Sequence, residues 1–160
     1  RYSVTDLLGD LAVDSAKLQP ERVFRIQVND VNIRLKMLEN NEMDAMLLTE
    51  PQATQALLQK HKVILDTRKE DIQMGAIVFR GKGMDDQNRK KQMAVFLKGY
   101  NEACDSINHY GVRHYRDVIK KYYTVSKQAL NALPDSLKFT HATHPRQKDI
   151  ERAQKWLLKK

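Results

Sequence analysis

Residues 1–80 carry apolar side chains at helical spacing in three separate segments. In the first segment, Leu7, Leu8 and Leu11 fall on one face, which predicts an amphipathic helix. A residue typical of a helix start stands near the beginning of each segment, such as Ser3 in the first and Pro51 in the third. The three predicted helices cover residues 3–16, 29–41 and 51–60.

Between these helices the pattern changes to short apolar runs and to strict alternation. Residues 23–28 place Val23, Arg25 and Gln27 on one side and apolar side chains on the other, which predicts a strand. The four predicted strands cover residues 23–28, 43–48, 63–65 and 75–79. Helices that alternate with strands in this way are typical of an α/β fold with a mostly parallel sheet and helices on its faces.

The second half of the chain shows helical spacing only. Gly111 suits the end of the long first helix, and Pro134 and Pro145 separate later segments. The predicted helices cover residues 87–110, 112–123, 126–133 and 147–158. We therefore expect an α/β ligand-binding lobe in residues 1–80, incomplete at its N-terminus, with the helices of residues 81–160 packed on it.

Charge divides the chain at the same point. The net charge is +8, but residues 1–80 hold 11 basic and 12 acidic side chains, whereas residues 81–160 hold 17 and 8. A phosphate-binding face and an ordinary solvated helical surface both remain open for this basic half. The aromatic and basic residues follow no pattern of RNA recognition or DNA binding, so we expect no nucleic-acid partner.

Candidate catalytic groups are sparse. The single cysteine, Cys104, lies on the apolar face of the long predicted helix, which favours a buried and unreactive thiol. His141 and His144 lie in a predicted loop without a third metal ligand at a suitable spacing. The residues 81–83, Gly-Lys-Gly, lack the full pattern of a phosphate-binding loop. The sequence therefore predicts no enzyme, no cofactor and no metal site.

Two short segments could bind a ligand. At the first predicted helix start, Tyr2, Ser3 and Thr5 offer hydroxyl groups next to free backbone N–H groups. At the end of the predicted strand 43–48, Thr49 and Glu50 would lie at the sheet edge where α/β proteins bind ligands. A carboxylate there could bind a cationic or amide-bearing ligand. An ordinary helix cap remains the alternative in both places.

Residues 38–51 resemble a signature of the NMT1/THI5-like family, the periplasmic substrate-binding proteins of ABC importers for thiamine pyrimidine, sulfonates and nitrate. The family pattern is a helix ending in Leu-x-x-Gly, an apolar-Asp-Ala strand, and then Glu-Pro before a helix. Asp44-Ala45 and Glu50-Pro51 match, whereas Asn41 replaces the usual glycine, a change that a left-handed helix end tolerates. Further resemblances follow in the family's order at residues 63–66, 75–80, 96–103, 133–134 and 154–157.

The resemblance implies a type 2 periplasmic-binding-protein fold, in which two lobes close on a small molecule and then dock on a membrane permease. This chain would be the second lobe with the C-terminal helices, and its partner would be the missing first lobe. Tyr2, Ser3 and Thr5 would offer hydroxyl and N–H groups to the ligand, and Glu50 would lie near the cleft or hinge. The protein would reside in the periplasm or be anchored as a lipoprotein.

Three other functions remain open. One is an enzyme of the same fold in thiamine or menaquinone biosynthesis, and another is the effector-binding domain of a transcription regulator. The third is a basic nucleic-acid-binding domain, whose affinity would fall steeply with salt.

Overall fold

The computed structural model describes residues 2–73 and 75–160, and within these residues it is helical and contains no strand. Arg1, which precedes the candidate residues Tyr2, Ser3 and Thr5, lies outside the described residues. Short 3₁₀ helices carry the label η. In chain order the elements are α1 (Val4–Ser15), η1 (Pro20–Arg22), α2 (Val31–Glu39), α3 (Gln52–Leu58), η2 (Gly81–Asp85), α4 (Gln87–Tyr110), η3 (Val112–Tyr115), α5 (Arg116–Tyr122), α6 (Lys127–Asn131) and α7 (Gln147–Leu157).

Capping residues fix where these helices begin and end. The Asp30 carboxylate accepts hydrogen bonds from the backbone N–H groups of Asn32 and Ile33 at the start of α2. Asp86 does the same for α4, whose bounds agree with the prediction. Gly111 ends α4 with φ at +80°, a conformation that favours glycine because it has no Cβ.

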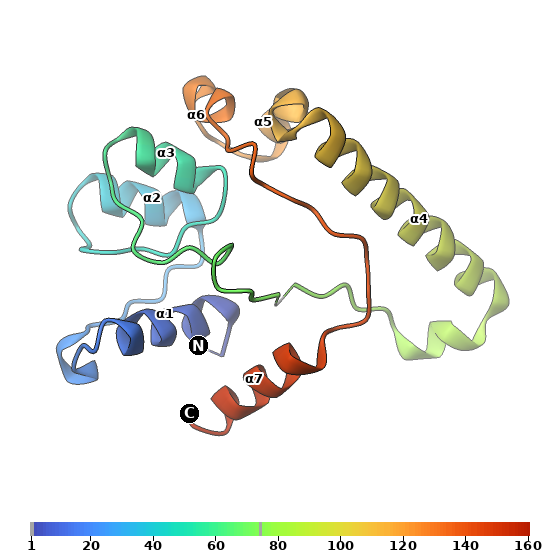
Figure 1. The fold of residues 1–160 in the computed structure, drawn as a ribbon, viewed down its shortest axis with the longest axis horizontal. Coiled ribbons are helices and arrows are strands. Elements are labelled where there is room, and N and C mark those ends of the chain that lie inside the picture. The colour runs from blue at the N-terminus through green and yellow to red at the C-terminus, as the bar shows by residue number, and fades with distance from the viewer. Residues whose placement is uncertain (1, 74) are drawn as a thin grey trace.

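The predicted α/β fold and its mostly parallel sheet are wrong. Residues 23–28, 43–48, 63–65 and 75–79 run without strand pairing, and Figure 1 draws them as coil. An alternating pattern indicates only that successive side chains would point to opposite faces. A strand also needs a neighbouring strand about 4.8 Å away, which binds its N–H and C=O groups. Within residues 2–73 and 75–160 no neighbour pairs in this way. Phe24 and Ile26 are accordingly 89% and 61% exposed.

The helices gather in small groups rather than on a sheet, so the expected packing of the second half on a sheet is also wrong. Figure 1 shows α2 and α3 together, α1 beside α7, and α4 running along one side. An apolar cluster joins the end of α4 to the short helices that follow. It consists of Val112, Leu130 and Leu133, with Ile107, Ile119, Val125 and Leu137 packed against them.

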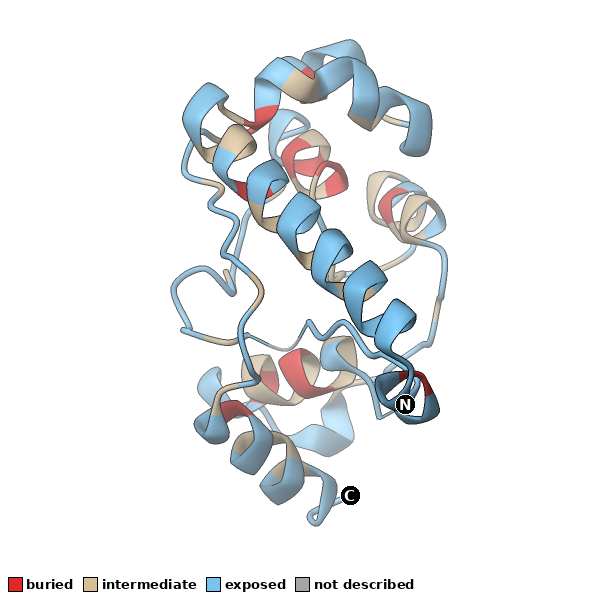
Figure 2. Ribbon diagram, turned by 90° about the vertical axis from the view of Figure 1, so that its right-hand side faces the viewer, coloured by how far each residue is buried: buried red, intermediate tan, exposed pale blue. Residues whose placement is uncertain are grey.

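The helix α4 is largely exposed over its 24 residues. Cys104 is its only buried residue among those described, and Figure 2 shows exposed residues along most of its length. The thiol donates a hydrogen bond to the Thr140 carbonyl oxygen at 3.4 Å, as suits the predicted buried cysteine. None of the described helices is both long and apolar enough to cross a membrane.

Candidate functional site

Arg34 holds two segments of the first half side by side. Its Nε donates to the Val28 carbonyl oxygen at 2.6 Å, and its Nη1 donates to the Leu47 carbonyl oxygen at 3.1 Å. One guanidinium therefore binds the backbone of both segments, at points shortly before α2 and α3 begin. The polar residues that follow, Asp30 on one segment and Thr49 on the other, are brought to the same edge of the molecule.

A side-chain hydrogen bond joins the starts of the two helices. The Gln52 Nε2 donates to Asn32 Oδ1 at 2.9 Å, and Gln52 is fully buried. The Gln52 Oε1 is buried too and accepts no hydrogen bond from the residues that the structure describes. A buried acceptor without a donor is costly, so this atom has unused capacity to accept an N–H group.

The predicted ligand residues Thr49 and Glu50 lie directly before Gln52. Glu50 Oε2 accepts hydrogen bonds from the Thr54 backbone N–H at 3.0 Å and from the Thr54 hydroxyl at 2.7 Å. One carboxylate oxygen thus caps α3, and the described residues donate no hydrogen bond to the other, Oε1. Thr49 is exposed. We call the group Asn29, Asp30, Asn32, Thr49, Glu50 and Gln52 the α2–α3 polar edge.

The cations near this edge are already occupied. Arg34 is bound to carbonyl oxygens, and the Arg68 guanidinium binds the Asp66 carboxylate through both its Nε and Nη2. The hydrogen bonds that Arg68 donates to Asp66 raise the pKa of Arg68, and the charge of Glu50 adds a smaller effect in the same direction. The polar edge therefore offers mainly acceptor oxygens and negative charge.

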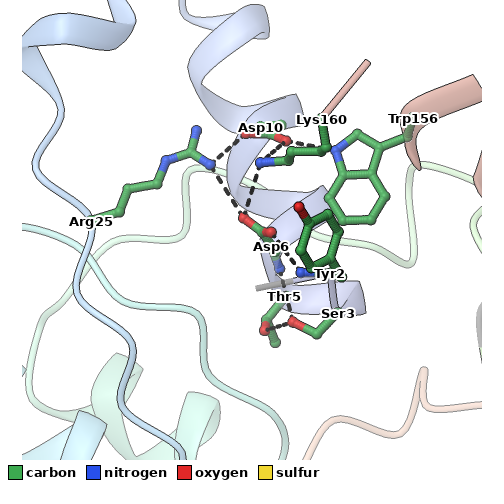
Figure 3. A network of polar contacts seen from close by, with 8 residues as sticks. All are labelled: Tyr2, Ser3, Thr5, Asp6, Asp10, Arg25, Trp156 and Lys160. Atoms are coloured by element: carbon green, nitrogen blue, oxygen red, sulfur yellow. Dashed lines mark hydrogen bonds and ion pairs between the residues drawn. The ribbon is translucent and has the colours of Figure 1, made fainter. Parts of the chain in front are cut away.

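The other predicted site residues, Tyr2, Ser3 and Thr5, lie at the start of α1 (Figure 3). The Ser3 Oγ accepts the Asp6 backbone N–H at 3.3 Å and lies 2.9 Å from the Thr5 hydroxyl. Ser3 therefore caps α1, the structural alternative that the sequence left open. Among the described residues, no hydrogen bond or ion pair joins this group to Thr49 or Glu50. The role of the three residues as ligand contacts stays a prediction.

Directly behind that cap, α1 and α7 are joined by a network that we call the terminal clasp: Asp6, Asp10, Arg25, Trp156 and Lys160 (Figure 3). The Trp156 indole N–H donates to Asp10 Oδ2 at 2.6 Å, and the Lys160 ammonium lies 2.9 Å from the same oxygen. Arg25 forms ion pairs with both Asp10 and Asp6. Lys160 also lies 5.3 Å from the centre of the Trp156 ring, within the range of a cation–π contact.

The clasp shifts the titration of both its carboxylates. Partial burial would raise the pKa of Asp10, but the hydrogen bonds from Trp156, Lys160 and Arg25 outweigh it and lower that pKa to about 2. The pKa of Asp6 is also lowered, because the Tyr2 backbone N–H and Lys160 outweigh the effect of burial. Both groups stay ionised as structural counter-ions at neutral pH.

Some basic residues of the second half form ion pairs with acids. The pairs include Arg113 with Asp135, and both Arg146 and Lys148 with Asp71. The first turn of α4 differs, because Arg89, Lys90 and Lys91 form no ion pair with any described residue. Arg116, Lys120 and Lys121 of α5 also form no ion pair with a described residue, so the unpaired positive charge of this half is spread over several elements.

The histidine pair His141 and His144 lies in a loop, as predicted. The His141 Nε2 lies 2.7 Å from Asp105 Oδ1, which ties the loop to α4. In the part of the chain that the structure describes, no group of three or more His, Cys, Asp or Glu side chains could hold a metal ion.

Sequence reasoning missed Asn32 and Gln52 as parts of the polar edge, and it missed Arg34 as the residue that joins the two segments. Each lies in a segment predicted as a helix, where a polar residue is usually a solvated one. The signal that could have found Gln52 was its place directly after Glu50-Pro51, since a polar residue in the first turn of a helix can bond to a neighbouring helix start.

Comparisons with protein-family models, with curated proteins and with solved structures find no match for this chain. The type 2 periplasmic-binding-protein fold that the resemblance implies is wrong for the described residues, which form no sheet, whereas the function that it implies stays a prediction.

Proposed function

We propose that the chain is the solute-binding component of an ABC importer, which captures a small molecule and delivers it to a membrane permease. The order of motifs in the resemblance motivates the proposal. One structural observation supports it: Arg34 and the Asn32–Gln52 hydrogen bond gather Thr49 and Glu50 with other polar groups on one edge. No reaction is proposed at this edge.

The chemistry of the polar edge favours a cargo that donates hydrogen bonds. Glu50 carries a negative charge, and the described residues donate hydrogen bonds to its Oε2 but not to its Oε1. The nearby cations are bound elsewhere. An aminopyrimidine carries N–H donors and no negative charge, whereas nitrate is anionic and offers only acceptors. Among the ligand classes that the resemblance implies, a thiamine-type pyrimidine therefore fits best.

Calorimetric titration with 4-amino-5-hydroxymethyl-2-methylpyrimidine tests this proposal. Glu50→Gln removes the charge but keeps an oxygen that can cap Thr54, so the fold should persist while Kd rises about tenfold. Glu42→Gln is the matched control, because Glu42 is exposed and its carboxylate accepts only from Asn40. No heat of binding in the wild-type protein, or an equal Kd for both variants and the wild type, would overturn the proposal.

A further inference from the structure

A second part of the molecule is hollowed at its surface and open to solvent. A hollow of about 620 Å³ lies between residues 79–80, η2 and the first three turns of α4. Its volume falls within the range of about 300–1,000 Å³ that is usual for small-molecule pockets. The hollow does not include Thr49, Glu50 or any other residue of the α2–α3 polar edge.

One wall of the hollow is aromatic and apolar. Phe79 and Phe96 meet edge to face, with ring centres 6.0 Å apart and an angle of 85° between the planes. Phe96 is nevertheless 51% exposed. Met93 lines the same wall and adds a flexible thioether that packs well against flat rings. A planar aromatic molecule could cover this exposed apolar surface.

Two arginines supply positive charge to the hollow. Arg80 and Arg89 line the hollow, and neither guanidinium pairs with an acid among the described residues. Gly83 is buried against the Arg89 side chain, since a Cβ built on it would lie 3.4 Å from Arg89 Cδ. A Cβ there would make an ordinary van der Waals contact, so Gly83 and the Arg89 stem lie next to each other.

The lining of the hollow includes the Asp86 carboxylate, which already accepts hydrogen bonds. Asp86 Oδ1 accepts the backbone N–H groups of Asn88 and Arg89, so it caps α4. The amide side chains of Asn88 and Gln92 also line the hollow and can bind an oxygen anion. With Lys90 and Lys91 on the adjoining turn, the surroundings carry net positive charge.

We propose that this hollow binds a planar aromatic molecule that carries an anionic group, such as an aromatic sulfonate or carboxylate. The ring would lie against Phe79, Phe96 and Met93, and the anion would bind the guanidinium groups of Arg80 and Arg89. The inference does not rest on the proposed function, because it uses different residues and an anionic rather than a neutral ligand.

Calorimetric titration with naphthalene-2-sulfonate tests this inference. The expected result is saturable binding, with Kd raised about tenfold by Arg89→Gln and by Phe96→Ala. Naphthalene-2-methanol has the ring but no anionic group, and methanesulfonate has the anionic group but no ring. Each should bind at least about tenfold more weakly than naphthalene-2-sulfonate.

Matched control variants distinguish binding in the hollow from nonspecific binding. Arg116→Gln removes an exposed arginine of α5, and Phe24→Ala removes a phenylalanine that is 89% exposed, both outside the hollow. Both should leave Kd unchanged, and circular dichroism should show equal helix content in all four variants. The inference is overturned if Arg89→Gln and Phe96→Ala bind like the wild type, if the controls lose as much affinity, or if only an oligonucleotide binds.

Discussion

The Trp156 indole donates to the Asp10 carboxylate at 2.6 Å and so ties the last helix of the chain to the first. The two residues stand 146 positions apart in sequence. Lys160 and Arg25 bind the same carboxylate from two other segments. Because a single acid receives three partners, Asp10 is the centre of the contact between α1 and α7.

Removing that acid should destabilise the protein. We expect Asp10→Ala to lower the free energy of unfolding by about 1–2 kcal/mol, since three hydrogen-bonded partners lose their acceptor. Urea denaturation monitored by Trp156 fluorescence measures the change. Asp14→Ala is the control, because Asp14 is exposed on the same helix, and it should stay within about 0.5 kcal/mol of the wild type. An equal loss in both variants would contradict a specific clasp.

The clasp also predicts how stability depends on pH. The folded pKa of Asp10 is about 2, below its ordinary value of 3.8, so the ionised form is favoured by folding. Its contribution is fully present above about pH 4 and is lost as the pH falls from about 4 to about 2. The hydrogen bonds from Lys148 and Arg146 also lower the pKa of Asp71 to about 2, so Asp71 contributes to the loss of stability over the same pH range.

Urea denaturation at several pH values between 7 and 2 tests this dependence. Asp10→Asn should lose less stability than the wild type between pH 4 and pH 2, by about 1 kcal/mol after allowance for solvent screening. Asp14→Asn should keep the wild-type dependence. Parallel curves for Asp10→Asn and the wild type would show that Asp10 titrates alike in the folded and unfolded chain.

Helix ends could be predicted well from the sequence because capping is local chemistry. Asp86 and Gly111 bound α4 where predicted, and Asn41 adopts a φ of +57°, the left-handed conformation expected at that helix end. The predicted strands failed because a strand depends on a partner that the local pattern does not specify. The alternation around Phe24 and Ile26 is real, but no paired neighbour buries those side chains.

Two glycines of the α4 region should respond in opposite directions to alanine. Gly111→Ala places a Cβ at a φ of +80°, so we expect a loss of about 1–2 kcal/mol. Gly99 lies inside α4 with open space around it, so Gly99→Ala should gain about 0.5–1 kcal/mol. Chemical denaturation of both variants measures the two values. A gain for Gly111→Ala would mean that α4 does not end at this residue.

The apolar cluster beside α6 should respond strongly to truncation. Leu130 is 3% exposed, so Leu130→Ala should cost about 2–4 kcal/mol through lost burial and the cavity it leaves. Leu158 is 88% exposed, and Leu158→Ala should change the free energy of unfolding by less than about 0.5 kcal/mol. Thermal and urea unfolding provide the comparison, and similar values for the two variants would contradict the cluster.

The candidate site was predictable only in part. Thr49 and Glu50 could be proposed from the sequence because they follow an apolar run and precede a proline, both of which are local features, and their role stays a prediction. Arg34 was missed because its role depends on two carbonyl oxygens, those of Val28 and Leu47, that come together only in the folded chain. The hollow beside Phe79 and Phe96 was missed for the same reason, since its two aromatic residues stand on separate segments.

A thermal-shift screen of the protein tests the solute-binding proposal most directly, because a ligand that binds only the folded state raises Tm by mass action. The panel is 4-amino-5-hydroxymethyl-2-methylpyrimidine, taurine, nitrate and small organic acids, with a short oligonucleotide as the comparison. The account predicts a dose-dependent rise in Tm with the aminopyrimidine, which Glu50→Gln reduces. A rise with the oligonucleotide alone, falling steeply as salt increases, would contradict it and assign function to the basic half.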